Sequence, residues 1–298
     1  MVDSILRPTG DLADAYTIDR RRNYIADDEA DTTGHGSDVL EILGYFAPRA
    51  TFEVYRVIAR NGRTRRSSLA QAIADAADDG VDVLNLSVGL YHSHEPANTC
   101  NGNCTVATES KYAAKNGTTI VAAAGNRDGE SVKGVYCPAV NDSAIGVGGL
   151  VSRCRSNVVD TPESGQYWIR NPTVEGPFCG QRGCDVSASC QENRLEQPWR
   201  GNVSFHNGEP DTLAPVHYPA GDAREPLLQK GTSFATPIVS GVLASIFGDL
   251  LEVGRDPDPQ TVRRAVRHSA REIDEGRIGK FDAERTWTHL ESESAPGD

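Results

Sequence analysis

The middle of the chain alternates between strand-like and helix-like patterns, and this rhythm constrains the fold more than any other feature. Short runs rich in β-branched, aromatic or small apolar residues occupy 52–58, 81–86, 118–123 and 144–148. Helical spacing of apolar residues fills 67–80 and 105–116, between these runs. Parallel strands need such crossovers and are buried on both faces. The pattern therefore predicts an α/β fold, with a mostly parallel sheet and helices on both faces.

The alternation stops after residue 150 and resumes near residue 233. The stretch between carries four of the cysteines, many Gly and Pro, and few apolar runs. Further helices are predicted over 233–251 and from Asp258-Pro259, where an N-cap precedes Pro at the first helical position. We interpret residues 1–290 as a single domain with a Cys-containing loop insertion at about 151–210, and 291–298 as a disordered tail.

The overall charge excludes some partners. The chain has 298 residues and a net charge of −12, so its mean field repels nucleic acid and anionic membranes. Lys contributes only positions 111, 115, 133, 230 and 280 to the 30 basic residues. An acidic, Lys-poor surface is typical of a halophilic organism, because high salt screens crowded carboxylates. A coding bias that favours Arg over Lys would give the same pattern.

The cysteines and the chain start point to different compartments. Seven Cys is an odd number, and most fall in two clusters, Cys100/Cys104 and Cys179/Cys184/Cys190. Clustered loop cysteines predict disulfides and an extracellular or cell-surface location. However, Met1-Val2-Asp3 shows no signal peptide, which leaves a cytoplasmic location as the alternative. No run of 18 apolar residues predicts a membrane span.

No metal site is predicted. Cys179, Cys184 and Cys190 with His206 depart from the usual zinc spacing, so disulfides that staple a long loop are the preferred interpretation. His92-x-His94 follows a predicted strand, and we expect it to lie in a solvated loop, although contact with substrate or metal is the alternative.

The strongest chemical signal is Gly231-Thr-Ser-Phe-Ala-Thr-Pro237, which runs into an apolar helical stretch. A serine in the first turn of a helix lies beside free N–H groups and the positive end of the helix dipole. This is an environment that a nucleophilic serine needs, because attack on a carbonyl creates an oxyanion beside it. Taken alone, Thr232 or Ser233 could equally be a helix cap.

Three further motifs are individually weak. His35 lies between two glycines at a predicted helix start, Asn126 follows a strand end in Ala123-Ala-Gly-Asn126, and Asp3 follows an apolar residue near the chain start. A lone histidine is usually structural, an asparagine after glycine is common in turns, and the aspartate motif is weak by itself.

Together with Asn85-Leu-Ser-Val-Gly89, these motifs resemble the subtilisin-like serine proteases, or subtilases, in the family's order Asp, His, Asn, Ser. The resemblance covers about residues 1–150 and 211–270. It implies a serine endopeptidase in which Ser233 is the nucleophile, His35 the general base and acid, and Asp3 the residue that orients His35. It also implies an oxyanion hole formed by the Asn126 amide and the Ser233 N–H.

The resemblance extends to substrate binding and cofactors. It implies that Ser87, Val88 and Gly89 pair with an extended peptide or protein substrate. It likewise implies that Ala123, Ala124 and Gly125 form the floor of a roomy, apolar pocket. No cofactor is required, although family members often hold structural calcium, for which the acidic run 27–31 is a candidate locus.

Several departures from the family pattern keep a second function open. Ile5 stands where the family has Gly, Asp38 where it has His, and Val216 where it has Gly. Only two residues precede Asp3, where the family has a whole strand, so we expect either a missing upstream segment or a divergent form. Asp19 is a rival for the orienting acid. The alternative function is a weakly active or inactive module that binds peptides or proteins.

Overall fold

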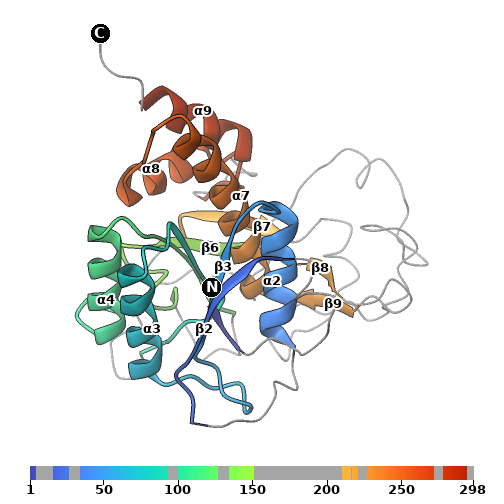
Figure 1. Ribbon diagram of the computed structural model, residues 1–298, viewed down its shortest axis with the longest axis vertical. Coiled ribbons are helices and arrows are strands. Elements are labelled where there is room, and N and C mark those ends of the chain that lie inside the picture. Colours follow the sequence, from blue (N-terminus) through green and yellow to red (C-terminus); the bar gives the residue numbers. More distant parts are fainter. Residues whose placement is uncertain are drawn as a thin grey trace.

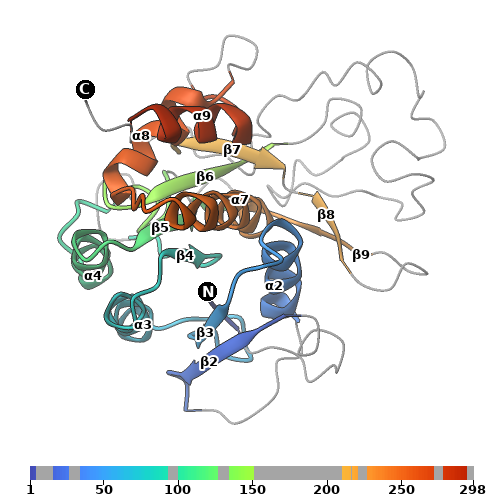
Figure 2. The ribbon, with the colours of Figure 1, turned by 45° about the horizontal axis from the view of Figure 1, so that its top comes forward.

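A seven-stranded parallel sheet forms the centre of the molecule (Figures 1 and 2). The computed structural model describes residues 1–4, 16–26, 34–92, 100–126, 134–150, 210–215, 217–220, 227–271 and 278–293. The strands are β1 (Val2–Asp3), β2 (Ile18–Asn23), β3 (Phe52–Arg56), β4 (Val83–Leu86), β5 (Thr119–Ala123), β6 (Ile145–Leu150) and β7 (Thr212–Pro215), in the spatial order β2-β3-β1-β4-β5-β6-β7. A separate antiparallel pair joins β8 (His217–Ala220) and β9 (Leu227–Lys230).

Helices cover both faces of this sheet, as predicted. The helices are α2 (His35–Phe46), α3 (Arg66–Asp78), α4 (Thr105–Lys115), α7 (Thr232–Glu252), α8 (Pro259–Ser269) and α9 (Ala283–Glu293). Strand β5 shows the two-sided burial: Ile120 and Ala122 join the core formed with α3 and α4, whereas Val121 joins the core formed with α7 and α8. Alternate side chains of a strand point to opposite faces, so the apolar runs are explained by burial on both sides.

The short strand β1 occupies the centre of the sheet. Val2 pairs with Tyr55 of β3 on one side and with Leu86 of β4 on the other. This position, between the longer β3 and β4, brings Asp3 to the carboxyl edge of the sheet. The sequence analysis did not assign β1 as a strand, because two residues are too few to show the alternation of apolar and polar side chains that marks a strand.

The long apolar helix α7 is a core element. It has the length and hydropathy of a membrane-spanning helix. However, Val239, Leu243 and Phe247 are buried in one cluster with Val121 and Ile145 of the sheet. Its apolar character is therefore explained by packing against the sheet.

One boundary differs from the sequence analysis, and a second falls outside the described residues. Helix α9 continues to Glu293, so residues 291–293 are helical and do not belong to a disordered tail; Leu290 anchors the last turn by full burial. The predicted insertion at 151–210 lies, except for Pro210, outside the described residues, so its interpretation stays a prediction.

Candidate active site

The predicted functional residues converge at the carboxyl edge of the sheet. Asp3 ends β1, Ser87 follows β4 directly, and Asn126 lies just after β5. His35 and Ser233 belong to the first turns of α2 and α7. In an open parallel sheet the carboxyl ends of all strands share one edge, where binding sites gather.

Asp3 and His35 form a hydrogen-bonded pair in which only the aspartate is fully buried. The Asp3 Oδ1 atom lies 2.7 Å from His35 Nδ1, and the Asp3 side chain is fully buried. The backbone N–H of Ser4 donates to the same oxygen at 2.6 Å. An imidazole that donates its Nδ1–H to a carboxylate presents Nε2 as an acceptor. Asp19, the rival acid, is exposed in the edge strand β2.

A close contact between two backbone segments fixes the position of this pair. The backbone N–H of Gly36 donates to the Ser4 hydroxyl at 2.9 Å. A Cβ at position 36 would lie 2.8 Å from the Ser4 carbonyl oxygen, so a side chain there would push α2 away from β1. This close approach explains why glycine follows His35.

The Ser233 hydroxyl is held by a reciprocal pair of hydrogen bonds. It donates to the Ser87 carbonyl at 3.0 Å, while the Ser87 hydroxyl donates to the Ser233 carbonyl at 2.8 Å. Phe234, the next residue, packs its ring against the His35 imidazole with centroids 5.3 Å apart. Ser233 and His35 thus lie at the starts of two neighbouring helices, and the Ser233 hydroxyl points to Ser87, just after the end of β4.

Asn126 is anchored through its carbonyl oxygen. The Thr232 N–H and hydroxyl donate to Asn126 Oδ1 at 3.0 and 3.3 Å. This leaves Nδ2 as the donating end of the amide. Gly231 has φ of 123°, and a Cβ there would lie 2.9 Å from Asn126 Nδ2. Glycine at this position keeps the amide donor beside the start of α7, whose first N–H groups lack intrahelical acceptors.

The predicted substrate-binding segments lie side by side. Leu90, just after Ser87, Val88 and Gly89, exchanges backbone hydrogen bonds with Cys137 at 2.9 and 2.8 Å. The Tyr136 N–H donates to the Ala124 carbonyl at 2.9 Å. Tyr136, which the sequence analysis missed, packs over both Gly89 and Gly125. Ala123 and Ala124 are buried. The predicted substrate-pairing edge (87–89) and the predicted pocket floor (123–125) therefore both lie against residues 136–137.

The family departures fall partly within the described residues. Asp38 is buried in the first turn of α2, where the positive end of the helix dipole favours a carboxylate. Ile5, Val216 and the acidic run 27–31 lie outside the described residues, so the calcium expectation has no structural counterpart here.

The cysteine prediction was wrong for the described residues. Cys100, Cys104 and Cys137 are free thiols, and their neighbouring sulphurs are 3.5 Å apart. Burial, with the two adjacent cysteines, raises the pKa of the Cys137 thiol far above its usual range. His92, expected in a solvated loop, is buried beside them. The cysteines at 154, 179, 184 and 190 lie outside the described residues.

Comparisons with known proteins agree on one family. A family model of the subtilases matches residues 8–285. The chain is 28% identical over 250 residues to the nisin leader peptide-processing serine protease NisP of Lactococcus lactis, covering 74% of this chain and 33% of that protein. It is 31% identical over 134 residues to a thermophilic serine proteinase of Bacillus sp. (strain AK1), covering 41% of this chain and 30% of that protein.

A solved structure shares the fold. A lanthipeptide protease superposes with a TM-score of 0.67 at 20% identity, covering 97% of this chain and 86% of the other. The chain spans about a third of the length of the curated relatives it matches.

Proposed function

The chain belongs to the subtilase family, and from that premise we propose that it is a serine-type endopeptidase that cleaves peptide bonds through an acyl-enzyme on Ser233. The observation that carries the proposal is the 2.7 Å contact between Asp3 and His35 at the helix start next to that of Ser233. A peptide-binding module without catalysis would not need a buried carboxylate on an imidazole.

We assign the proton transfers to His35. The Ser233 Oγ attacks the substrate carbonyl carbon, and His35 Nε2 takes the hydroxyl proton. The C–N bond then breaks as His35 gives that proton to the leaving amine. Water attacks the acyl-enzyme in the same way and regenerates Ser233. Asp3 holds the Nδ1–H and stabilises the imidazolium formed in each half-reaction.

The hydrogen bond from Ser233 to Ser87 supports a role for substrate in activating the site. We assign Ser87, Val88 and Gly89 to pairing with the substrate backbone. A substrate N–H that pairs with the Ser87 carbonyl would compete with the Ser233 hydroxyl for this oxygen. The displaced hydroxyl would then favour the rotamer that faces His35. Breaking one such bond costs only about 0.5–1.5 kcal/mol, which substrate binding can supply.

The oxyanion would be stabilised at the start of α7. The Asn126 amide nitrogen and the Ser233 N–H are the proposed donors, and the anchoring of Asn126 Oδ1 by Thr232 supports this assignment. Preorganised donors matter because they need no rearrangement as charge develops. Ala123, Ala124 and Gly125 are the proposed pocket floor.

The reaction needs no cofactor, and its partner is a peptide or protein substrate.

We further propose that the enzyme comes from a halophilic organism and acts outside the cell. Its net charge of −12 supports salt adaptation. Raising KCl should then raise the melting temperature and activity together, because salt screens the repulsion among carboxylates. A melting temperature that falls steadily with KCl would contradict salt adaptation.

A fluorophosphonate probe tests the main proposal. The wild-type protein, in high salt, should be labelled on Ser233 and should cleave a denatured protein substrate. Ser233→Ala should lose both properties, while Ser292→Ala, in the surface helix α9, should keep both. Absence of labelling on folded wild-type protein would favour the binding-module alternative. The same conclusion would follow if the wild-type protein and Ser233→Ala both bound a peptide and neither cleaved it.

A further inference from the structure

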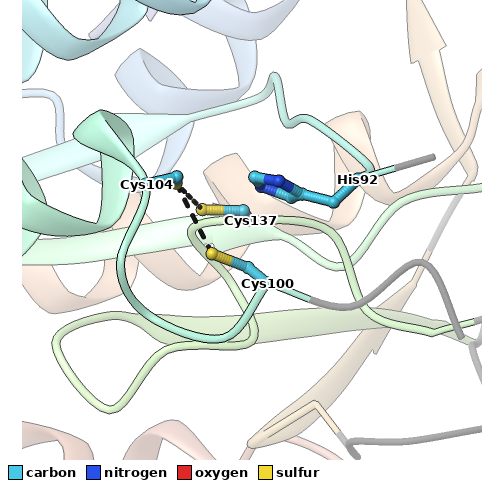
Figure 3. A group of neighbouring side chains, drawn as sticks. All are labelled: His92, Cys100, Cys104 and Cys137. Carbon is cyan, nitrogen blue, oxygen red and sulfur yellow. Dashed lines mark hydrogen bonds between the residues drawn. The ribbon is translucent and has the colours of Figure 1, made fainter. Parts of the chain in front are cut away.

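A second polar cluster lies beside the proposed substrate-binding edge. Figure 3 shows His92, Cys100, Cys104 and Cys137 with the imidazole directed towards the sulphur atoms. One ligand atom from each residue lies within 4.8 Å of the other three. The residues come from the chain after β4, the loop before α4, the N-cap of α4 and the segment between β5 and β6.

The spacing between the sulphurs differs from that of a disulfide. Cys104 Sγ lies 3.5 Å from both Cys100 Sγ and Cys137 Sγ, whereas bonded sulphurs lie about 2.05 Å apart. Thiolates on one tetrahedral Zn²⁺, at about 2.3 Å from the metal, lie about 3.8 Å apart. The observed spacing is therefore close to that of an edge of a zinc tetrahedron.

Each sulphur also receives an N–H hydrogen bond. The backbone N–H of Gly102 donates to Cys100 Sγ, that of Ala107 to Cys104 Sγ, and the Asn141 amide to Cys137 Sγ, each at 3.4 Å. Such donors stabilise negative charge on sulphur and orient metal ligands from outside the coordination sphere. Three separate donors, one for each sulphur, form a prepared outer shell.

The surroundings also offset the charge of three thiolates. Cys104 is the N-cap of α4, where the helix dipole favours an anion. Lys111 donates to the Gly102 carbonyl at 2.8 Å and so brings a positive charge to the loop that carries Cys100. Three thiolates with one divalent ion have a net charge of −1, which these groups partly compensate.

We propose that His92, Cys100, Cys104 and Cys137 bind a structural Zn²⁺ ion. Three soft thiolates and one imidazole within tetrahedral reach are the donor set that zinc prefers in closed structural sites. The Cys100-x₃-Cys104 spacing falls within the range of zinc-binding cysteine pairs. All four tetrahedral positions are filled by protein, so the ion would have no open position for catalysis.

The proposed ion would fasten the substrate-binding edge. His92 lies three residues beyond Gly89, and Cys137 is paired with Leu90 through two backbone hydrogen bonds. Zinc would therefore tie the Ser87–Gly89 segment to the Tyr136 segment and to α4. This positional role rests on the proposed protease function, whereas metal binding itself does not.

Metal analysis tests the site directly. Protein purified without chelator should contain about one equivalent of zinc per chain. Replacement of zinc by Co²⁺ should give the charge-transfer and ligand-field bands of a tetrahedral thiolate site. Reduced, folded protein that takes up neither zinc nor cobalt would overturn the proposal. So would iron with acid-labile sulphide, or an intact mass that shows a disulfide among Cys100, Cys104 and Cys137.

Matched variants test the ligand set. Cys104→Ser and His92→Ala should lose at least tenfold in zinc affinity, while Cys184→Ser and His94→Ala should keep it. Loss of zinc from Cys184→Ser with retention in Cys104→Ser would overturn the assignment and place the metal in the 179–206 region. Should Cys104→Ser fail to fold, Cys184→Ser still decides: it should keep the cobalt spectrum of the wild-type protein, and loss of that spectrum would overturn the assignment.

A chelator tests the positional role separately. Removal of zinc should lower the melting temperature and raise KM for long peptide substrates more than it lowers kcat. Unchanged KM in zinc-depleted, folded enzyme would overturn the positional role. Labelling of Ser233 in the same sample separates this outcome from failure of the protease proposal, since labelling tests Ser233 alone.

Discussion

The two polar clusters at the carboxyl edge of the sheet are built in different ways. The Asp3, His35 and Ser233 cluster uses residues at strand ends and helix starts, held by short contacts of Gly36 and Gly231 with neighbouring segments. The cysteine cluster uses loop residues and the N-cap of α4, and His92 and Cys137 reach Cys100 and Cys104 only through the sheet. In the first, the rigid backbone sets the geometry; in the second, we propose that a metal completes it.

This difference implies different responses to perturbation. A catalytic cluster on rigid elements should lose activity steeply when a donor is removed, with little change in folding. A metal-completed cluster should respond first through stability and substrate affinity. The predictions below test that contrast, from the largest expected effect to the smallest.

Asn126→Ala should lower kcat about 10²–10³-fold with little change in KM, because it removes one proposed donor to the oxyanion. Steady-state kinetics measures the effect. Asn116→Ala is the matched control, because it changes an asparagine that caps the end of α4 and whose side-chain amide donates to the Tyr112 carbonyl at 2.9 Å. An Asn126→Ala enzyme with wild-type kcat would show that the amide plays no part in the reaction.

Gly231→Ala should lower kcat about tenfold or more and destabilise the protein by about 1–2 kcal/mol. The φ of 123° at position 231 is unfavourable for alanine, and the added Cβ would lie 2.9 Å from Asn126 Nδ2. Gly248→Ala, inside the helix that Gly231 precedes, is the control. Beyond its chain neighbours and the backbone of its own helix, no heavy atom of the described residues lies within 4 Å of a Cβ at this position, so the change should stabilise α7 by about 0.5–1 kcal/mol. Equal effects of the two changes on kcat would argue against a special role for position 231.

Cys104→Ser should raise KM for long peptides several-fold and leave the rate of Ser233 labelling within about twofold of wild type. The reason is that Cys137 pairs with Leu90 beside the proposed substrate edge, whereas the proposed reacting groups belong to β1, α2 and α7. Labelling kinetics measured beside KM checks this. A large fall in labelling rate would mean that the two clusters are coupled more tightly than their separate construction suggests.

Asp258→Ala should destabilise the protein by about 0.5–2 kcal/mol without changing kcat. Asp258 belongs to neither cluster and caps α8 through the N–H groups of Gln260 and Thr261 at 3.0 and 3.1 Å. Partial burial opposes its ionisation, but the Thr261 and Gln260 hydrogen bonds outweigh this and lower its pKa. The stabilisation is therefore present above about pH 4 and lost as pH falls through the lower folded pKa. Melting curves of both proteins against pH measure it, and a difference that grows on acidification would contradict the assignment.

Much of the fold could be predicted because the sheet is buried on both faces. Strands such as β5 and helices such as α3 carry strong apolar patterns, and Asp258-Pro259 marks the start of α8. The strands β1 and β2 could not be predicted, since the first has two residues and the second, Ile18–Asn23, is largely polar at the sheet edge. Long-range pairing, which no local pattern contains, determines both.

The two clusters also differ in how far local sequence patterns reveal them. His35, Asn126 and Ser233 could be picked out as candidates because each lies in a short glycine-containing motif that must shape the backbone locally, and their catalytic roles stay a prediction. The partners of Cys104 could not, because Cys137 and His92 reach it only through the packing of β4 and β5. The Cys100-x₃-Cys104 spacing was the one local signal, and clustering alone led to the disulfide interpretation. Three metal-bound thiolates would fit either compartment, so the extracellular location stays a prediction.

The most direct test of the central claim compares two aspartates. Asp3→Asn keeps the size of the buried side chain but removes the charge that orients His35. It should therefore slow the fluorophosphonate labelling of Ser233 by about 10⁴-fold, while Asp19→Asn, in the exposed edge strand, should label at the wild-type rate. Equal labelling rates for the two variants, or slower labelling for Asp19→Asn, would contradict the assignment of Asp3, His35 and Ser233 as one catalytic unit.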